Sequence, residues 1–201
     1  PKYWDTKLAK NILKKHGNFD LIYSANTISH IKDLNDVFKS IDLVLSKNGT
    51  FILEDPSLIE CLKRNTYDQF YNEHIYVFSY LSLNNILKKF NLEIYKIENL
   101  DIHGGSNRYF IKRINNKIKI EKSVIKQKRE ETKYGLNKKN TYFKFTKRVQ
   151  ESKKKLISIF KYCKSKNKKI IGYGATAKST TILNYCNIND QTIDYFLDTT
   201  K

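Results

Sequence analysis

The sequence predicts an α/β fold with a parallel sheet, because helix-like and strand-like patterns alternate from its start. Residues 7–15 have the apolar spacing of a short helix, and residues 19–25 form a mostly apolar run typical of a buried parallel strand. Between residues 31 and 45, apolar side chains recur at steps of three or one, as in an amphipathic helix. Residues 50–54 form a second strand-like run. The order helix, strand, helix, strand indicates an α/β protein.

Breaker residues predict where these elements end. Glycine after a helix allows the left-handed backbone that closes it, and proline cannot donate to a continuing sheet ladder. The pairs expected to end the first helix, the second helix and the second strand are His16-Gly17, Asn48-Gly49 and Asp55-Pro56.

The middle of the chain predicts another edge of the sheet. Residues 57–80 are rich in aromatic side chains and have no clear periodicity, so we expect an irregular segment. A helix is predicted from about Ser82, and residues 92–100 and 108–113 resemble strands. A short loop joins these strands, which predicts an antiparallel pair at the sheet edge.

The composition changes near residue 115. Lysine dominates residues 117–169, where we predict two helices with a break around residues 134–140 and favour a basic helical linker. A strand that runs into a glycine turn and a helix begins at Lys169, and residues 193–198 resemble its next strand. This pattern predicts the start of a second α/β unit.

The net charge of the chain is high. Its 201 residues include 38 Lys and Arg against 20 Asp and Glu, a formal charge of +18. Such a surplus suggests an anionic partner, such as nucleic acid, a nucleotide-bearing ligand or a membrane surface. The alternative, which we favour for much of the charge, is drift of solvated faces toward lysine in an AT-rich genome.

Cysteine usage and hydropathy restrict the class of protein. The three cysteines lie far apart without a CxxC pair, so we expect free thiols in a reducing cytoplasm and neither a disulfide framework nor a zinc site. No apolar run approaches the ~20 residues needed to span a bilayer, and no signal peptide is recognisable. The chain begins at Pro1 and lacks Met, so we expect it to be the C-terminal part of a longer protein.

One of the four histidines lies beside residues that could assist proton transfer. His74 follows Tyr71-Asn72-Glu73. Imidazole has an ordinary pKa of about 6.5 and can take a proton at cellular pH. A nearby carboxylate would favour the imidazolium that forms. The alternative is a structural Glu-His pair in an aromatic loop.

Three further motifs offer ligand contacts. His103-Gly104-Gly105-Ser106 exposes backbone and side-chain donors, and His30 follows the first strand, where open α/β sheets bind ligands. Gly172-Tyr173-Gly174 resembles a phosphate-binding turn, with Lys178 one helical turn further on, although Ala177 replaces the third glycine. The structural alternatives are a polar turn, a helix-start residue without a role and a tight strand-to-helix turn.

In their order and spacing, these motifs resemble one family, the S-adenosylmethionine-dependent C-methyltransferases that act on nucleotide-linked keto sugars. The resemblance extends over nearly the whole chain. The matching segments are residues 20–31, Glu54-Asp55-Pro56, residues 70–74 with Phe78-Ser79, His103-Gly104-Gly105-Ser106 with Arg108, residues 172–178 and residues 183–186. Two positions depart from the family pattern: Asn72, where His or Asp is usual, and Thr176, where proline is common.

The resemblance implies three parts. Residues 1–115 would be the C-terminal part of a methyltransferase domain, namely the second half of a Rossmann-like (class I) sheet with an antiparallel edge. Residues 116–166 would be the basic helical linker, and residues 167–201 the start of a C-terminal Rossmann-like substrate-binding domain. The zinc-binding segment and the glycine-rich cofactor loop of the family would precede this chain.

The reaction implied by the resemblance is methylation of a sugar carbon. A 4-keto group acidifies the C3–H bond, a base removes the proton, and the carbanion carbon of the enolate attacks the methyl group of S-adenosylmethionine, which releases S-adenosylhomocysteine. The resemblance implies that His74 is the base, Glu73 its orienting and charge-balancing partner, and Tyr71 a donor to the enolate oxygen or a contact of the sugar. His30 remains a rival for the base.

The resemblance also implies a set of ligand contacts. Asn26, just past the first strand, is the expected contact with S-adenosylmethionine, and the planar fork of Arg108 suits a diphosphate. A zinc ion is expected only in the preceding segment, and the oligomeric state stays open. The residues expected to bind the sugar nucleotide are Tyr76, His103, Gly104, Gly105, Ser106, Arg108, Tyr173, Lys178 and Asn184.

Two other functions remain as alternatives. A nucleic-acid-binding module, or an RNA-directed methyltransferase, would use the lysine-rich helices and bind with a steep salt dependence. The aromatic residues argue against it, because they cluster with Glu73 and His74 more than with the lysine runs. The other alternative is an inactive fragment that binds S-adenosylmethionine poorly because it lacks the cofactor loop.

Overall fold

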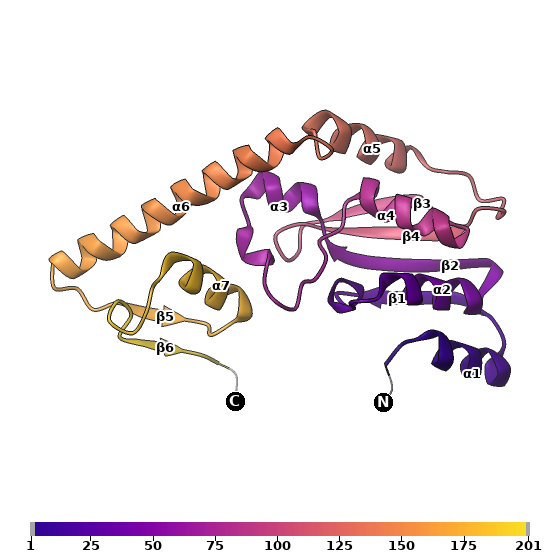
Figure 1. Cartoon of the computed structure of the whole chain (residues 1–201), viewed down its shortest axis with the longest axis horizontal. Helices are drawn as coiled ribbons and strands as arrows, with labels where there is room; N and C mark the ends of the chain where they lie inside the picture. Colours follow the sequence, from indigo (N-terminus) through magenta and orange to yellow (C-terminus); the bar gives the residue numbers. More distant parts are fainter. Residues whose placement is uncertain (1–2, 200–201) are drawn as a thin grey trace.

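A four-stranded sheet forms the centre of the computed structural model, which describes residues 3–199 (Figure 1). β1 and β2 are parallel, and β4 is antiparallel to both β2 and β3. β3 therefore runs in the same direction as β1 and β2, which confirms the predicted α/β class and the antiparallel pair. In spatial order, the strands are β1 (Phe19–Ala25), β2 (Leu45–Pro56), β4 (Ser106–Arg113) and β3 (Leu92–Leu100).

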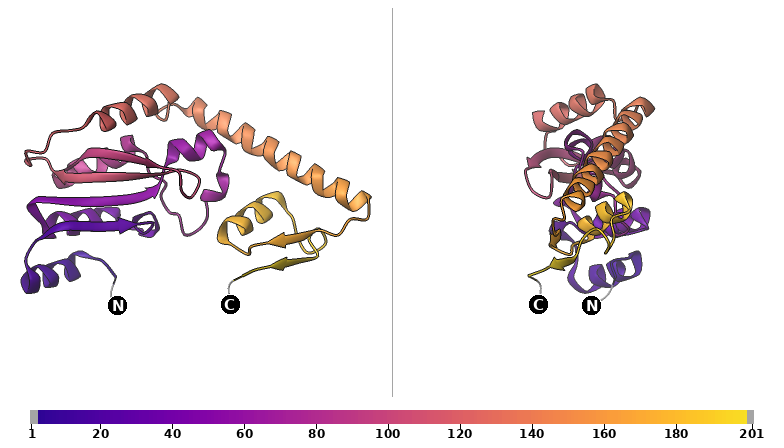
Figure 2. Two further views of the ribbon diagram at one scale, coloured as in Figure 1. Left: turned by 180° about the vertical axis from the view of Figure 1, so that it is seen from behind. Right: turned by 90° about the vertical axis from the view of Figure 1, so that its left-hand side faces the viewer.

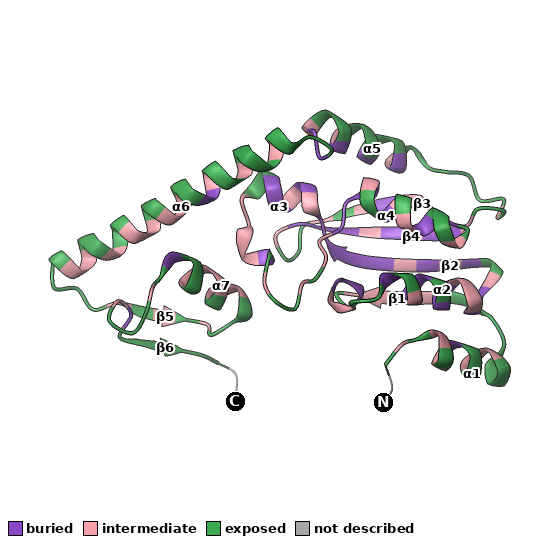
Figure 3. Cartoon of the chain, viewed as in Figure 1, coloured by how far each residue is buried: buried purple, intermediate pink, exposed green. Residues whose placement is uncertain are grey.

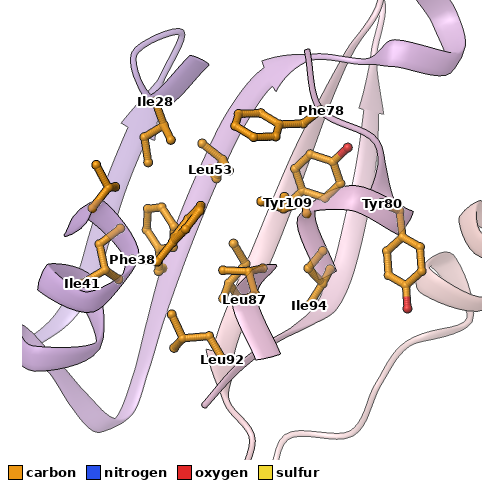
Figure 4. Packing of buried hydrophobic residues seen from close by; sticks show 14 of the residues in the cluster. Ile28, Phe38, Ile41, Leu53, Phe78, Tyr80, Leu87, Leu92, Ile94 and Tyr109 are labelled. Atoms are coloured by element: carbon orange, nitrogen blue, oxygen red, sulfur yellow. The ribbon is translucent and has the colours of Figure 1, made fainter. Parts of the chain in front are cut away.

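Helices α2 (Leu34–Val44) and α4 (Tyr80–Leu87) pack on one face of this sheet, and α1 (Thr6–His16) contacts α2 (Figures 1 and 2). The alternate side chains of the strands meet the apolar stripes of the helices, with Phe38, Leu53, Leu87 and Tyr109 at 0% exposure (Figure 4). Burial of each such side chain stabilises the fold by about 1.5–3 kcal/mol. This layer fixes the strand ends that form the site.

The predicted boundaries of the second helix and the second strand are wrong. α2 begins only at Leu34, after the 3₁₀ turn η1 (Ile28–His30), and the chain passes from α2 directly into β2. Asn48-Gly49 therefore lies inside the strand, which also includes Asp55-Pro56. A Cβ atom at position 49 would lie 2.9 Å from the carbonyl oxygen of Phe19 in β1. The glycine is needed for this close approach of the strands.

The segment predicted to be irregular contains a helix. α3 (Leu58–Arg64) follows β2 almost directly, and a 3₁₀ turn, η2 (Tyr67–Gln69), comes next. Ile59 and Leu62 are buried against Leu136. Seven residues make only about two helical turns, too few for a clear periodic pattern, so this helix is visible only once its packing partner is in place.

The two predicted lysine-rich helices are α5 (Lys122–Tyr134) and α6 (Lys139–Ser165), with the expected break between them. Most of α6 is exposed and runs away from the sheet (Figure 3). β5 (Ile171–Tyr173), α7 (Ala177–Cys186) and β6 (Tyr195–Leu197) form the predicted second α/β unit with parallel strands. α7 lies back against η2. Within residues 3–199, none of the helices combines the length and the apolar character needed to cross a membrane.

Candidate active site

A cavity of about 150 Å³ lies at the carboxyl ends of β1 and β2, the edge at which open α/β sheets bind ligands. Six of its eight lining residues are ones that the sequence analysis selected, and they come from four separate segments of the chain. The lining residues are Asn26, His30, Pro56, Gln69, Tyr71, His74, His103 and Lys178.

Turns at the strand ends place the polar residues around this cavity. Asn26 leaves β1 in the left-handed region with φ of 48°, and its amide donates to the Glu54 carbonyl oxygen at 2.8 Å. His103 has φ of 51° in the loop between β3 and β4, where its carbonyl oxygen accepts a hydrogen bond from the Gln69 side chain. Asn and His adopt this region more readily than most residues, so these turns suit their side chains.

The hydrogen bonds of His74 determine its tautomer. Nδ1 lies 2.8 Å from the Gln69 carbonyl oxygen, which can only accept, so Nδ1 carries the proton of the neutral ring. The lone pair is then on Nε2, 3.1 Å from the Tyr71 hydroxyl oxygen. Burial lowers the pKa of His74 from its ordinary 6.5, and nearby His30 and Lys178 lower it further, although the hydrogen bond to Gln69 raises it. The ring is therefore a neutral base at pH 7.

Tyr71 donates its hydroxyl proton to this base. Burial raises the pKa of Tyr71, and the charge of Glu73 raises it further, so the phenol is protonated at neutral pH. The ring centroids of Tyr71 and His74 are 4.2 Å apart, and the ring of His30 lies 4.9 Å from that of His74 in an edge-to-face arrangement. The two candidate bases are thus neighbours in one cavity.

The expected contact between Glu73 and His74 is not formed in this structure. Glu73 is exposed, and within the described residues the His74 ring hydrogen-bonds to Gln69 and Tyr71. A backbone carbonyl therefore orients the imidazole in place of the neighbouring carboxylate. Glu73 instead lines an adjacent groove of about 390 Å³, together with Asn184 of α7.

Of the loop His103-Gly104-Gly105-Ser106, only His103 lines the cavity. Gly104 and Gly105 have φ of 83° and 109°, and a Cβ atom on Gly105 would lie 2.6 Å from Cβ of Glu60, so these positions need glycine. Ser106 is buried at the start of β4, where its hydroxyl donates to the Ile102 carbonyl oxygen at 3.4 Å. These residues shape the turn that presents His103.

Three further predicted substrate contacts also lie outside the cavity lining. Arg108 forms an ion pair with Glu54 at 2.8 Å, across the ladder between β4 and β2. The hydroxyl of Tyr76 donates to the Lys32 carbonyl oxygen at 2.7 Å. Tyr173 is 77% exposed. The fold therefore does not gather these side chains around His74.

Two buried residues that support the cavity are not among the predicted site residues, although Asp55 belongs to the matching segment Glu54-Asp55-Pro56. Gln69, with 1% exposure, contacts both His103 and His74. Asp55 is fully buried, and its carboxylate accepts a hydrogen bond from Ser29 at 2.6 Å. The observation that distinguishes them is burial of a polar side chain, which requires the fold. Within residues 3–199, no group of three or more His, Cys, Asp or Glu could hold a metal ion.

Known families match both parts of the chain. A family model described as the C-methyltransferase C-terminal domain matches residues 101–201, and one described as a methyltransferase domain matches residues 2–97. The C-methyltransferase NovU of Streptomyces niveus is 28% identical over 200 residues, which cover 100% of this chain and 48% of that protein. The chain thus spans about half the length of this curated relative.

Two solved methyltransferase structures align with part of this chain. A SAM-dependent methyltransferase from Anabaena variabilis aligns over 54% of this chain and 55% of its own, with a TM-score of 0.40 and 17% identity. The phosphoethanolamine N-methyltransferase 2 of Haemonchus contortus aligns over 70% of this chain and 30% of its own, with a TM-score of 0.30 and 20% identity.

Proposed function

Because the chain belongs to the C-methyltransferase family, we propose that it methylates a carbon atom of a nucleotide-linked 4-keto sugar with S-adenosylmethionine as the methyl donor. The observation that carries this proposal is the neutral His74 ring, whose Nε2 accepts from the Tyr71 hydroxyl and which lines a cavity together with Tyr71, His30 and Lys178. A base of lowered pKa beside a phenol donor suits removal of a proton next to a carbonyl group.

In the proposed reaction, His74 and Tyr71 act on the same substrate. The 4-keto group acidifies the C3–H bond, and Nε2 of His74 takes that proton. The hydroxyl hydrogen of Tyr71 turns from Nε2 to the keto oxygen, where it stabilises the developing enolate. The electron pair of the C–H bond becomes the enolate, and the proton stays on the imidazolium. His30 remains the rival base, since its ring lies 4.9 Å from that of His74.

Two cavities at the end of β1 fit the methyl donor. Asn26 lines the cavity that contains His74, and a second cavity of about 290 Å³ combines apolar walls at Trp4, Ile28 and Ile31 with polar groups at Thr27. An adenosyl group needs such apolar walls with a few polar contacts. When bound, S-adenosylmethionine supplies an electrophilic methyl group. Asn26 and the second cavity would hold it.

The positive charge of the chain has a role in this proposal. Lys178 lines the cavity, and after burial and the neighbouring His30 its charge is a further factor that lowers the pKa of His74. An ammonium group there would attract a dianionic sugar nucleotide or balance the enolate. The adjacent groove that contains Glu73 and Asn184 is where the nucleotide would lie.

We also propose a cytoplasmic location, and we expect zinc only in a segment preceding residue 1.

The decisive experiment measures two rates in the intact protein: methyl transfer to a deoxythymidine diphosphate 4-keto sugar, and solvent deuterium exchange at C3. General base catalysis contributes ~10²–10⁴-fold, so His74→Ala should lose about that factor in exchange. His16→Ala, on exposed α1, is the control. Full exchange in His74→Ala and loss in His30→Ala would transfer the role to His30. Wild-type protein that binds random RNA with a steep salt dependence, and exchanges no C3 proton, would refute the proposed function.

A further inference from the structure

Buried Asp55 accepts a hydrogen bond from Ser29, the residue directly before His30. We propose that Asp55, acting through Ser29, is a positioning residue that holds His30 and His74 at their observed separation. The inference rests on the proposed function only for its catalytic consequence. The contacts that carry it are independent of any substrate.

Asp55 lies at the end of β2, one residue before Pro56, which lines the cavity. Its side chain has 0% exposure, and Oδ1 accepts a hydrogen bond from the Ser29 hydroxyl at 2.6 Å. Oδ2 has no hydrogen-bond partner within the described residues. A buried carboxyl group with an unpartnered oxygen destabilises a fold, so its presence requires a compensating role.

Ser29 connects this carboxylate to both histidine segments. It directly precedes His30 in η1 and is 1% exposed. Its carbonyl oxygen accepts a hydrogen bond from the Tyr76 amide at 3.1 Å, two residues beyond His74. Ser29 therefore links β2 to both histidine segments. Its hydroxyl donates to Asp55 of β2, and its carbonyl oxygen accepts from the loop that carries His74.

A second contact closes this arrangement. The Tyr76 hydroxyl donates to the Lys32 carbonyl oxygen at 2.7 Å, two residues beyond His30. The two segments are thus joined at both ends of Tyr76, and the contact with Asp55 attaches the Ser29 side chain to the sheet. Loss of that contact would remove one of the attachments that fix both segments relative to the end of β2.

The electrostatics of Asp55 support a role in hydrogen bonding. Burial raises the pKa of Asp55 to about 6, against the hydroxyl and amide of Ser29, which lower it, while Glu54 raises it further. The group thus remains mostly ionised at pH 7 as an acceptor for Ser29. Asparagine at this position keeps an oxygen acceptor and removes the charge, which makes Asp55→Asn the informative substitution.

The experiment compares Asp55→Ala, Asp55→Asn and Ser29→Ala in the intact protein, with Ser40→Ala as the control. Ser40 is a fully buried serine of α2 whose hydroxyl donates to Thr6. The readouts are deuterium exchange at C3, the split between kcat and KM, and the titration of His74 followed by NMR. A shift of about 1 Å in a reacting group can cost ~10²-fold in rate.

We expect Asp55→Ala and Ser29→Ala to lose about tenfold to 10²-fold in exchange with little change in KM. The titration midpoint of His74 should rise, because the ring loses burial and the neighbouring His30. Asp55→Asn should restore both readouts to near wild type. Folded Ser29→Ala with wild-type exchange and titration would overturn the proposal, as would Asp55→Asn as impaired as Asp55→Ala. The His74 titration needs no substrate, so it tests positioning even if the proposed reaction is refuted by inactive wild-type protein.

Discussion

The hydroxyl oxygen of Tyr71 lies 3.1 Å from Nε2 of His74, and its hydrogen points to the lone pair that would abstract a proton. Because a hydroxyl hydrogen rotates about its C–O bond, the same oxygen can turn its proton to a substrate carbonyl without a movement of heavy atoms. The rotation that frees Nε2 of His74 to accept the C3 proton would then also direct the Tyr71 hydroxyl to the enolate oxygen. This coupling distinguishes Tyr71 from a residue that only packs against the ring.

Tyr71→Phe tests this coupling. Removal of one donor to a developing oxyanion typically lowers kcat by about 10²–10³-fold, so we expect a loss of that size in methyl transfer and in C3 exchange, with KM changed little. Steady-state kinetics and NMR exchange measure both. Tyr142→Phe, which removes a hydroxyl that bonds to the Leu136 carbonyl oxygen on the linker, should leave both rates unchanged. Exchange at the wild-type rate in Tyr71→Phe would exclude the proposed donor role.

The pH dependence follows from the lowered pKa of His74. The base acts when neutral, so kcat/KM should rise with pH to a plateau, with a midpoint below 6.5. The unfolded chain titrates near the ordinary pKa and therefore binds more protons than the folded chain between the two values. The free energy of unfolding should fall as pH drops from about 6.5 toward the folded pKa. His74→Gln should remove this part of the acid-side loss, as measured by urea unfolding at several pH values; an acid limb above pH 6.5 would contradict the assignment.

The strands show how far sequence patterns determine this fold. β1 and β3 begin and end where the apolar run and the alternation predict them. The alternation in β3 coincides with burial, but β1 is an edge strand with Leu21 and Tyr23 mostly exposed, so the predicted burial of that strand is wrong. The sequence predicts the boundary between α2 and β2 wrongly because Leu45 fits the apolar spacing of α2, whereas in the structure it is the first, buried residue of β2. A single apolar residue satisfies either period, and only the pairing of Phe19 with Leu45 decides between them.

The candidate site likewise contains residues that the sequence predicts and residues that only the fold identifies. Tyr71, His74 and His30 are visible in the sequence because their side-chain chemistry is distinctive. Gln69 is not, since it orients His74 through a backbone carbonyl that every residue possesses. Adjacency in sequence predicts Glu73 for that role, but adjacency in an irregular turn does not determine which side chains meet. Arg108 has charge suited to phosphate, yet the ladder places it opposite Glu54.

Glu131→Ala should destabilise the fold. Glu131 of α5 is 0% exposed and accepts hydrogen bonds from the amides of Tyr80 and Leu81 at 2.8 and 3.0 Å, so it caps the start of α4. Unsatisfied buried donors cost about 1–3 kcal/mol each, and we expect the free energy of unfolding to fall by about 2–4 kcal/mol in urea. Glu130→Ala removes an exposed ion pair with Lys63 and should change it by less than about 1 kcal/mol. Equal effects of the two substitutions would show that α5 does not stabilise the sheet domain through this cap.

Lys178→Met tests whether the second α/β unit contributes a charge to the site. Hydrogen bonds to charged groups contribute about 1.5–3 kcal/mol, so the substitution should lower kcat/KM for the sugar nucleotide roughly tenfold or more. Because the ammonium group lowers the pKa of His74, its removal should also shift the acid limb of the rate profile to higher pH. Lys155→Met, on the exposed side of α6, reduces net charge equally and should change neither quantity. If both variants weaken binding alike and leave the acid limb in place, long-range attraction by the lysine-rich surface explains the affinity, and Lys178 has no specific place in the cavity.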